Sequence, residues 1–163
     1  MNYPKRKQLR LKDYDYSSNG CYFITICTKD RKPMFWAVGA GSPRPRLSEV
    51  GKIVKLWILK INEKYPEINL EKFVIMPNHL HLLLMIDRAN GRGDPAPTIK
   101  CAIGWLKYHI TVDINRISNT PGKQIFQRSF HDHIIRDDND YAVRWEYIDD
   151  NINRWLDDEY YTN

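Results

Sequence analysis

Hydrophobic and polar positions recur along the chain with two periods, and these periods predict strands and helices. Residues 21–28 (CYFITICT) mix β-branched and aromatic side chains in near alternation, so we predict a strand there. Residues 69–76 and 79–86 predict two more strands, and the Pro-Asn pair between them predicts an antiparallel hairpin. After a Pro-Gly turn, residues 124–136 are predicted to be extended.

Apolar residues at helical spacing predict three helices, each preceded by a residue that can cap it. Ser48 would cap a helix that runs to about residue 65. Thr98 would cap a second helix, and Asp137 or Asp138 would open a last helix reaching about residue 156. The apolar face of the second helix comprises Ile99, Ile103, Leu106, Ile110 and Ile114. The apolar stripe of the last helix comprises Tyr141, Trp145, Ile148, Ile152 and Trp155.

The predicted order of elements is strand, helix, strand, strand, helix, strand, helix. The first six predict an α+β fold, a ferredoxin-like βαββαβ sandwich with an antiparallel sheet and helices on one face. The seventh is an additional C-terminal helix, assigned to residues 137–157. With 163 residues, the chain fits a single domain (residues 1–163) that begins with a basic arm at residues 1–20.

Charge is divided unevenly along the chain. Residues 1–136 carry 23 Lys and Arg against 11 Asp and Glu, whereas residues 137–163 carry 2 against 9. A basic body suits a polyanion such as nucleic acid, although ordinary solubility charge would give the same composition. The acidic tail beside a basic groove could hold a metal or discourage loose DNA binding.

Composition also bears on the class of protein. Its 42% hydrophobic and 12% aromatic content excludes general disorder. No apolar run approaches the roughly 20 residues that span a membrane, and the N-terminus is not an apolar signal segment. Three cysteines without zinc-type pairing favour reduced thiols, so we expect a cytoplasmic protein without a membrane partner.

Two short patterns carry candidate chemistry. His79 and His81 flank Leu80 in a predicted strand, so both imidazoles face one side and can bind a divalent metal together. Alone, such a pair could equally be polar residues at a strand edge. On the last helix, Asn151 follows Tyr147 by one turn, about 100° around from the apolar stripe. Alone, this row could equally be ordinary helix surface.

Together, these residues form a plausible nuclease site. A tyrosine hydroxyl is a weak nucleophile near neutral pH because its pKa is about 10. It can attack phosphorus when a metal polarises the phosphate and withdraws charge from it. Two histidines and the Asn151 oxygen leave coordination positions open, and this ligand set suits Mg²⁺ or Mn²⁺ better than zinc. Attack by Tyr147 would yield a 5′-phosphotyrosine and a free 3′-hydroxyl.

Four blocks of the sequence form a further pattern: RLKDYDYSSNGCYFITICTKDRK, FVIMPNHLHLLL, QRSFHDHIIRD and YIDDNINRW. Together they cover the chain from about residue 6 to residue 155. In content and in order, these blocks resemble a known family, the REP-associated branch of the single-tyrosine HUH transposases.

This resemblance implies a ferredoxin-like fold and metal-dependent cleavage of single-stranded DNA at imperfect palindromic hairpins. The sequence leaves both a monomer and a homodimer open. It matches His79 and His81 to the metal-binding pair, Tyr147 to the nucleophile and Asn151 to the residue completing the metal shell. The family usually places proline after that asparagine, whereas Ile152 stands here. We therefore expect the helix to continue through Ile152.

Other residues are weaker candidates. Of a second His-x-His pair, His131 and His133, only His133 matches the family block, and packing or a phosphate contact fits it better than a metal. Tyr108 lacks an amide partner of the Tyr147 kind, and Tyr160 and Tyr161 are expected in a mobile tail. For DNA contact we predict Lys5, Arg6, Lys7, Arg10 and Lys12, with Arg128, Arg136 and Arg144 as further positions.

Two other classes of function stay open. The chain could be a domesticated relative that binds hairpins without cutting, although its complete set of candidate catalytic residues argues against this. It could also be an unrelated metal hydrolase or a small RNA-binding sandwich. The third predicted strand, however, carries Leu and Met where an RNA-stacking surface would need Phe or Tyr.

Overall fold

The structure, a computed structural model, describes residues 19–37, 46–87 and 98–161. Most of the predicted basic arm lies outside the described residues, including all five of its proposed DNA contacts. Much of the Gly- and Pro-rich stretches around residues 38–45 and 88–97 is outside them as well.

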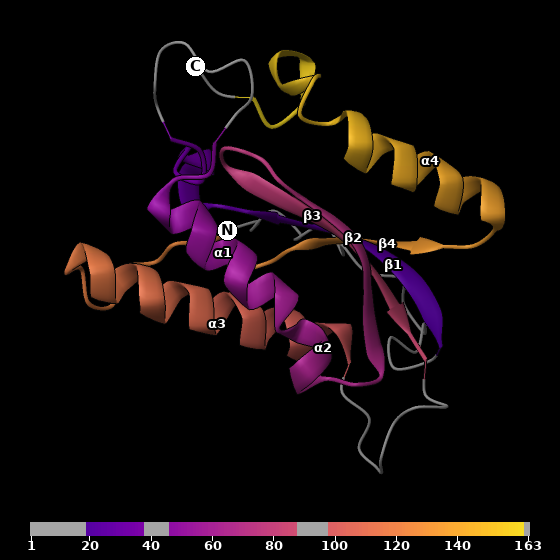
Figure 1. Ribbon diagram of the computed structural model, residues 1–163, viewed down its shortest axis with the longest axis horizontal. Helices are drawn as coiled ribbons and strands as arrows, with labels where there is room; N and C mark the ends of the chain where they lie inside the picture. The colour runs from indigo at the N-terminus through magenta and orange to yellow at the C-terminus, as the bar shows by residue number, and fades with distance from the viewer. Residues whose placement is uncertain (1–18, 38–45, 88–97, 162–163) are drawn as a thin grey trace, which may run out of the picture.

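A four-stranded antiparallel sheet forms the centre of the fold (Figure 1). Its order is β2-β3-β1-β4, and every neighbouring pair is antiparallel. The pattern confirms the predicted ferredoxin-like sandwich, including the hairpin of β2 and β3. The strands are β1 (Gly20–Cys27), β2 (Ile68–Ile75), β3 (His79–Ile86) and β4 (His131–Ile135).

The helices begin where the sequence predicts. Ser48 accepts a hydrogen bond from the Gly51 amide, Thr98 accepts one from Cys101, and Asp137 accepts one from Asp140. The first predicted helix is wrong in one respect, because the chain breaks at Lys60 into two helices. The helices are α1 (Glu49–Leu59), α2 (Ile61–Lys64), α3 (Ile99–Ser118) and α4 (Asp138–Asp150), with short 3₁₀ turns at Lys29–Arg31 and Trp155–Asp157.

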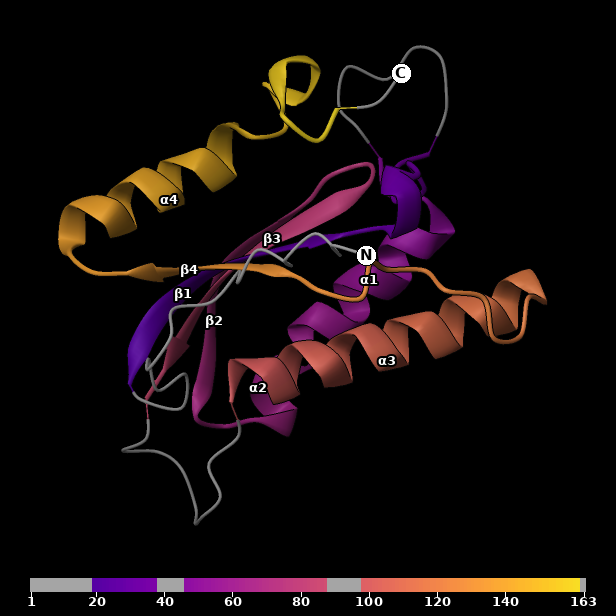
Figure 2. The ribbon, with the colours of Figure 1, turned by 180° about the vertical axis from the view of Figure 1, so that it is seen from behind.

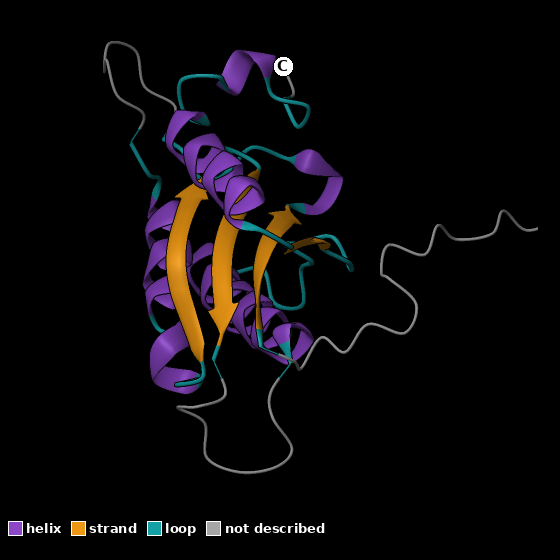
Figure 3. Cartoon of the chain, turned by 90° about the vertical axis from the view of Figure 1, so that its right-hand side faces the viewer, coloured by secondary structure: helices purple, strands orange, loops and turns teal. Residues whose placement is uncertain are grey.

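The two faces of the sheet have different coverings (Figures 2 and 3). Because side chains alternate along a strand, even-numbered residues of β1 and β3 pack with α1 and α3 in the main core. All five predicted apolar positions of α3 are buried there. Odd-numbered residues, such as Phe23 and Leu83, form a smaller cluster beneath α4 with Ile148. The helix bearing Tyr147 therefore covers the face of β3 that carries His79 and His81.

The predicted extent of the C-terminal helix is wrong. Helix α4 ends at Asp150, and the expected continuation through Ile152 does not occur. The amides of Asn153 and Arg154 both donate to the Asp150 carbonyl, which tightens the chain into a turn. Ile152, predicted to pack, is 40% exposed, whereas Tyr147 and Asn151 face the sheet together with Ile148 of the apolar stripe. The turn directs the following segment back across the sheet.

Two further observations complete the fold. Among the helices that the structure describes, none has the length and apolar character needed to cross a lipid bilayer. The three cysteines are free thiols, with Cys21 and Cys27 buried and Cys101 exposed.

Helix α1 packs so closely that one of its positions requires glycine. A Cβ atom built on Gly51 would lie 2.1 Å from the Phe35 carbonyl oxygen, whereas one on Gly104 of α3 would have no neighbour within 4 Å. We expect Gly51→Ala to destabilise the fold by about 3 kcal/mol through this backbone clash. Gly104→Ala, the matched control, should stabilise α3 by about 0.5–1 kcal/mol. Urea unfolding measures both, and equal midpoints for the two variants would contradict the close approach.

Candidate functional site

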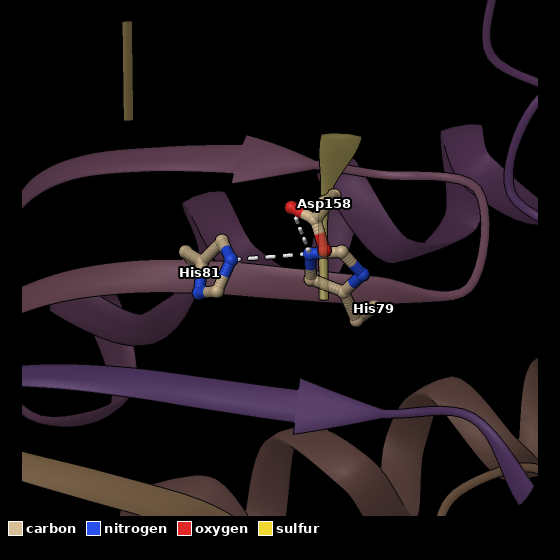
Figure 4. A group of neighbouring side chains, drawn as sticks. All are labelled: His79, His81 and Asp158. Atoms are coloured by element: carbon tan, nitrogen blue, oxygen red, sulfur yellow. Dashed lines mark hydrogen bonds and ion pairs between the residues drawn. The ribbon is translucent and has the colours of Figure 1, made fainter. Parts of the chain in front are cut away.

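His79 and His81 bring their ring nitrogens together on the α4 side of β3 (Figure 4). Their Nε2 atoms lie 3.1 Å apart, and the residues are 0% and 1% exposed. The spacing of two residues on a strand produces this arrangement, because both side chains must leave on one face. The prediction that the two imidazoles point the same way is therefore confirmed.

Hydrogen bonds to Nδ1 fix both rings. The side-chain Nδ2 of Asn78 donates to the carbonyls of Arg31 and Tyr160, so its Oδ1 faces His79 and accepts from Nδ1–H at 2.9 Å. The Nε2 of His79 is left with its lone pair. Thr25 lies directly opposite His81 in the strand register, and its hydroxyl is 2.8 Å from His81 Nδ1. Partners of this kind orient metal-binding histidines.

Both imidazoles are neutral at physiological pH. Burial lowers the pKa of His79 to about 3, and the positive charge of Arg31 adds to the effect. Burial, the neighbouring His79 and the charge of Arg144 all lower the pKa of His81 well below its usual value. Metals bind deprotonated histidine, so the pair has the protonation state that coordination needs.

Asp158 joins the pair from the segment that follows α4 (Figure 4). Its Oδ2 lies 3.9 Å from His79 Nε2, and its side chain is 3% exposed. The other oxygen, Oδ1, accepts a hydrogen bond from the Tyr160 amide. Burial raises the pKa of this carboxyl. One potential ligand atom from each of these three residues lies within 4.8 Å of the others, a group that could hold a metal ion.

Contacts from two loops hold the segment of Asp158 in place. Asn78 donates to the Tyr160 carbonyl, and Arg31 donates to the Glu159 carbonyl while lying 5.1 Å from the Tyr160 ring centroid. The Tyr160 ring also lies 4.6 Å from that of His79. The expectation of a mobile tail at Tyr160 is wrong, because this residue is only 9% exposed and packs on the histidines.

Tyr147 and Asn151 reach the same place from α4. The Tyr147 ring meets His81 edge-on at 5.2 Å and Phe23 at 5.8 Å, measured between ring centroids. Burial raises the pKa of the Tyr147 hydroxyl, the charge of Asp158 raises it further, and a hydrogen bond with Asn151 lowers it. The hydroxyl therefore keeps its proton at neutral pH.

The donor set fits a divalent metal. Asn151 is 2% exposed, and its Oδ1 has no hydrogen-bond partner among the described residues. A buried oxygen without a partner is costly, so this atom suits a role as an acceptor for a cation. Two neutral imidazole nitrogens with one amide and one carboxylate oxygen make a mixed nitrogen and oxygen site.

A pocket of about 720 Å³ opens beside Tyr147, Asn151 and Asp158. Five carboxylates and one guanidinium are among its lining groups, which makes the approach to the tyrosine acidic. A DNA phosphate would be repelled there unless cations compensate the charge.

No family model matches the chain. An uncharacterized protein of Haemophilus influenzae is 31% identical over 173 residues, covering 97% of this chain and 94% of its own length. The two proteins belong to one family. A second H. influenzae protein, provisionally named a REP-associated tyrosine transposase, is 28% identical over 82% of this chain and 70% of its own length.

Two solved structures share the fold. A REP-associated tyrosine transposase bound to a REP hairpin matches with a TM-score of 0.62 and 20% identity, over 87% of this chain and 72% of that one. A provisionally named transposase from Deinococcus radiodurans matches with a TM-score of 0.51 and 17% identity, over 86% and 95%. The resemblance to REP-associated tyrosine transposases predicted from the sequence blocks is confirmed.

The structure brings the four central predicted residues, His79, His81, Tyr147 and Asn151, into one site. It places other predicted residues elsewhere. Arg128 and Arg136 are exposed. Arg144, by contrast, lies beside the site: its side chain is 31% exposed, and its guanidinium carbon is 5.4 Å from the centroid of the Phe23 ring that stacks on His81. His131 is exposed on β4, and His133 pairs with Asp140 at 2.7 Å. Within the described residues, neither belongs to a three-residue group able to hold a metal.

Sequence reasoning missed Asp158, Thr25 and Asn78. The acidic tail was a signal for Asp158, because metal binding was one of the roles considered for that tail. Nothing in the sequence, however, singles out one of its nine carboxylates. Thr25 could have been found only from the register of β1 against β3. Asn78 directly precedes His79, but its use as a hydrogen-bond acceptor depends on carbonyls from distant segments.

Proposed function

We propose that this chain is a transposase that cuts and rejoins single-stranded DNA at imperfect palindromic hairpins, using Mg²⁺ or Mn²⁺ and Tyr147 as nucleophile. One observation carries the proposal: a buried histidine pair, an Asn151 oxygen that has no partner within the described part of the chain, and Tyr147 converge beneath α4. The resemblance to REP-associated tyrosine transposases supports the proposal, and the structure of one such transposase was solved bound to a REP hairpin. We also propose that residues 1–163 form one domain and that the protein is cytoplasmic.

The histidine pair, Asn151 and Asp158 would hold the metal. When bound, it supplies positive charge that polarises the scissile phosphate. Asn78 and Thr25 keep the two rings oriented. The acidic lining of the pocket would keep DNA away from Tyr147 in the absence of compensating cations. The site would therefore link DNA access to metal binding.

Cleavage would be a transesterification. The Oη atom of Tyr147 attacks phosphorus, its proton is lost to water in the pocket, and the bond to the 3′ oxygen breaks. The 3′ oxygen takes up a proton, so the products are a 5′-phosphotyrosine and a 3′-hydroxyl. The number of phosphodiester bonds is unchanged, which lets a second 3′-hydroxyl reverse the step and join the strand elsewhere.

The basic arm is proposed to contact the DNA backbone. Replacing Lys5, Arg6, Lys7, Arg10 and Lys12 with alanine is expected to weaken hairpin binding and flatten its salt dependence, because fewer counterions are released. Binding titrations at about 50 mM and at about 200 mM salt measure the slope of affinity against salt concentration. An unchanged slope would remove the arm from the DNA interface.

Labelled single-stranded oligonucleotides carrying the palindromic repeats that flank the protein's own gene test the proposed function. After incubation with Mn²⁺ or Mg²⁺, a denaturing protein gel should show label at the protein's mass only when metal is present. Hairpin binding without such a band would overturn the nuclease proposal and favour a domesticated hairpin-binding protein.

A further inference from the structure

Arg144 occupies the α4 face that carries Tyr147, one helical turn before it. Its guanidinium carbon lies 5.4 Å from the centroid of the Phe23 ring. That ring is stacked on His81 at 5.0 Å with an interplanar angle of 20°, and Tyr147 meets it edge-on. The Phe23 ring thus contacts three groups: the cation Arg144, the candidate metal ligand His81 and the candidate nucleophile Tyr147.

A carboxylate on the same helix fixes the position of this cation. Asp140 Oδ1 accepts from Arg144 Nε at 3.3 Å, and Asp140 Oδ2 is 2.7 Å from His133 Nε2. His133 lies opposite Phe23 in the register of β4 and β1, so the sheet itself fixes this anchor. Among the residues that the structure describes, Arg144 forms an ion pair with Asp140 alone. Its terminal Nη groups therefore retain donors for a ligand.

The charge of Arg144 acts on the site. Burial has the largest influence on both neighbouring groups: it raises the pKa of Tyr147 and lowers the pKa of His81. The guanidinium of Arg144 lowers the pKa of each. The pocket beside Tyr147 is lined by five carboxylates and by the guanidinium of Arg154, so a phosphate attacked by Tyr147 needs further cationic partners. A guanidinium suits this role because its N–H groups match the spacing of phosphate oxygens.

We infer that Arg144 donates to a non-bridging oxygen of the phosphate attacked by Tyr147, and that Asp140 and His133 are positioning residues that aim it. The inference rests on the proposed function and adds a second source of positive charge at the reacting phosphate. Charge on the non-bridging oxygens is redistributed during attack, and a preorganised donor stabilises it without reorganising. Arg144 therefore acts on the rate of cleavage rather than on hairpin affinity.

Single-turnover cleavage of a hairpin oligonucleotide tests this assignment. Arg144→Ala is expected to lower the rate by about 10²–10³-fold with unchanged hairpin affinity. Asp140→Ala should lower the rate less, again without changing affinity, and added guanidine should partly restore Arg144→Ala. The matched control is Arg116→Ala, which removes an arginine paired with Asp113 on α3, across the sheet, and should cleave normally.

A methylphosphonate at the cleaved position separates direct contact from a structural role. In one of its two stereoisomers, a methyl group replaces the non-bridging oxygen that faces Arg144. On that stereoisomer, Arg144→Ala should lower the cleavage rate by only about threefold or less. An equal loss on phosphate and on both stereoisomers would overturn the contact, as would normal cleavage by Arg144→Ala. Absence of any covalent product with the unmodified protein would instead refute the proposed function and, with it, this inference.

Discussion

Tyr147→Phe is expected to abolish metal-dependent covalent capture of DNA while leaving hairpin affinity unchanged. The substitution removes only the hydroxyl oxygen, and the ring can keep its edge contacts with His81 and Phe23. Loss of a nucleophile removes the reaction path rather than weakening it, so the rate should fall by at least about 10³-fold. The gel assay with labelled oligonucleotide measures the adduct, and a binding titration measures affinity.

Tyr141→Phe is the matched control for this variant. Tyr141 lies on α4 as well, is partly buried, and donates a hydrogen bond to Glu71 at 3.4 Å instead of facing the histidines. It should form the adduct at the normal rate. Undiminished capture by Tyr147→Phe would assign the nucleophile to another residue and contradict the proposed mechanism.

The second large effect concerns the metal. Mn²⁺ should raise the thermal unfolding midpoint of the unmodified protein, because a ligand that binds only the folded state stabilises it. At a concentration about 100 times the Kd, the gain would be about 2.7 kcal/mol. His81→Gln should eliminate this shift, because the ring nitrogen facing His79 is lost. Asp158→Asn should weaken metal affinity by about 10–100-fold if its carboxylate coordinates.

His109→Gln provides the control for general destabilisation. His109 stacks on Trp57 at 4.4 Å in the helical layer on the other side of the sheet, so its loss would affect packing but not the metal site. Its Mn²⁺ shift should equal that of the unmodified protein. A full shift in His81→Gln would show that the metal does not bind at the histidine pair.

The fold could be predicted because local patterns agree with the tertiary arrangement. Alternation in β1 and β3 separates the residues of the two sheet faces, and the caps Ser48, Thr98 and Asp137 mark helix starts. The end of α4 could not be predicted from periodicity. Ile152 continues the apolar spacing in sequence, yet the turn at Asn151 removes it from the packed face.

The candidate site was predictable only in part. His79 and His81 follow from strand geometry, and Tyr147 and Asn151 follow from helical spacing and the family blocks. Asp158 could not be identified, because it reaches the site through a turn whose position depends on Asn78 and on Arg31. The apolar stripe was right in part, since Ile148 is buried and Tyr141 and Trp155 pack beside it, but Tyr147 also faces the sheet although it lies off that stripe.

Peptide mapping of the covalent product tests the central claim most directly. Trypsin cuts after Arg144 and Arg154, so the intervening peptide, WEYIDDNINR, contains Tyr147 as its only tyrosine. Tyr108, Tyr141 and the pair Tyr160 and Tyr161 fall in three other tryptic peptides. The account predicts the nucleotide mass on the peptide containing Tyr147, formed only with metal. The same mass on any other peptide would contradict it.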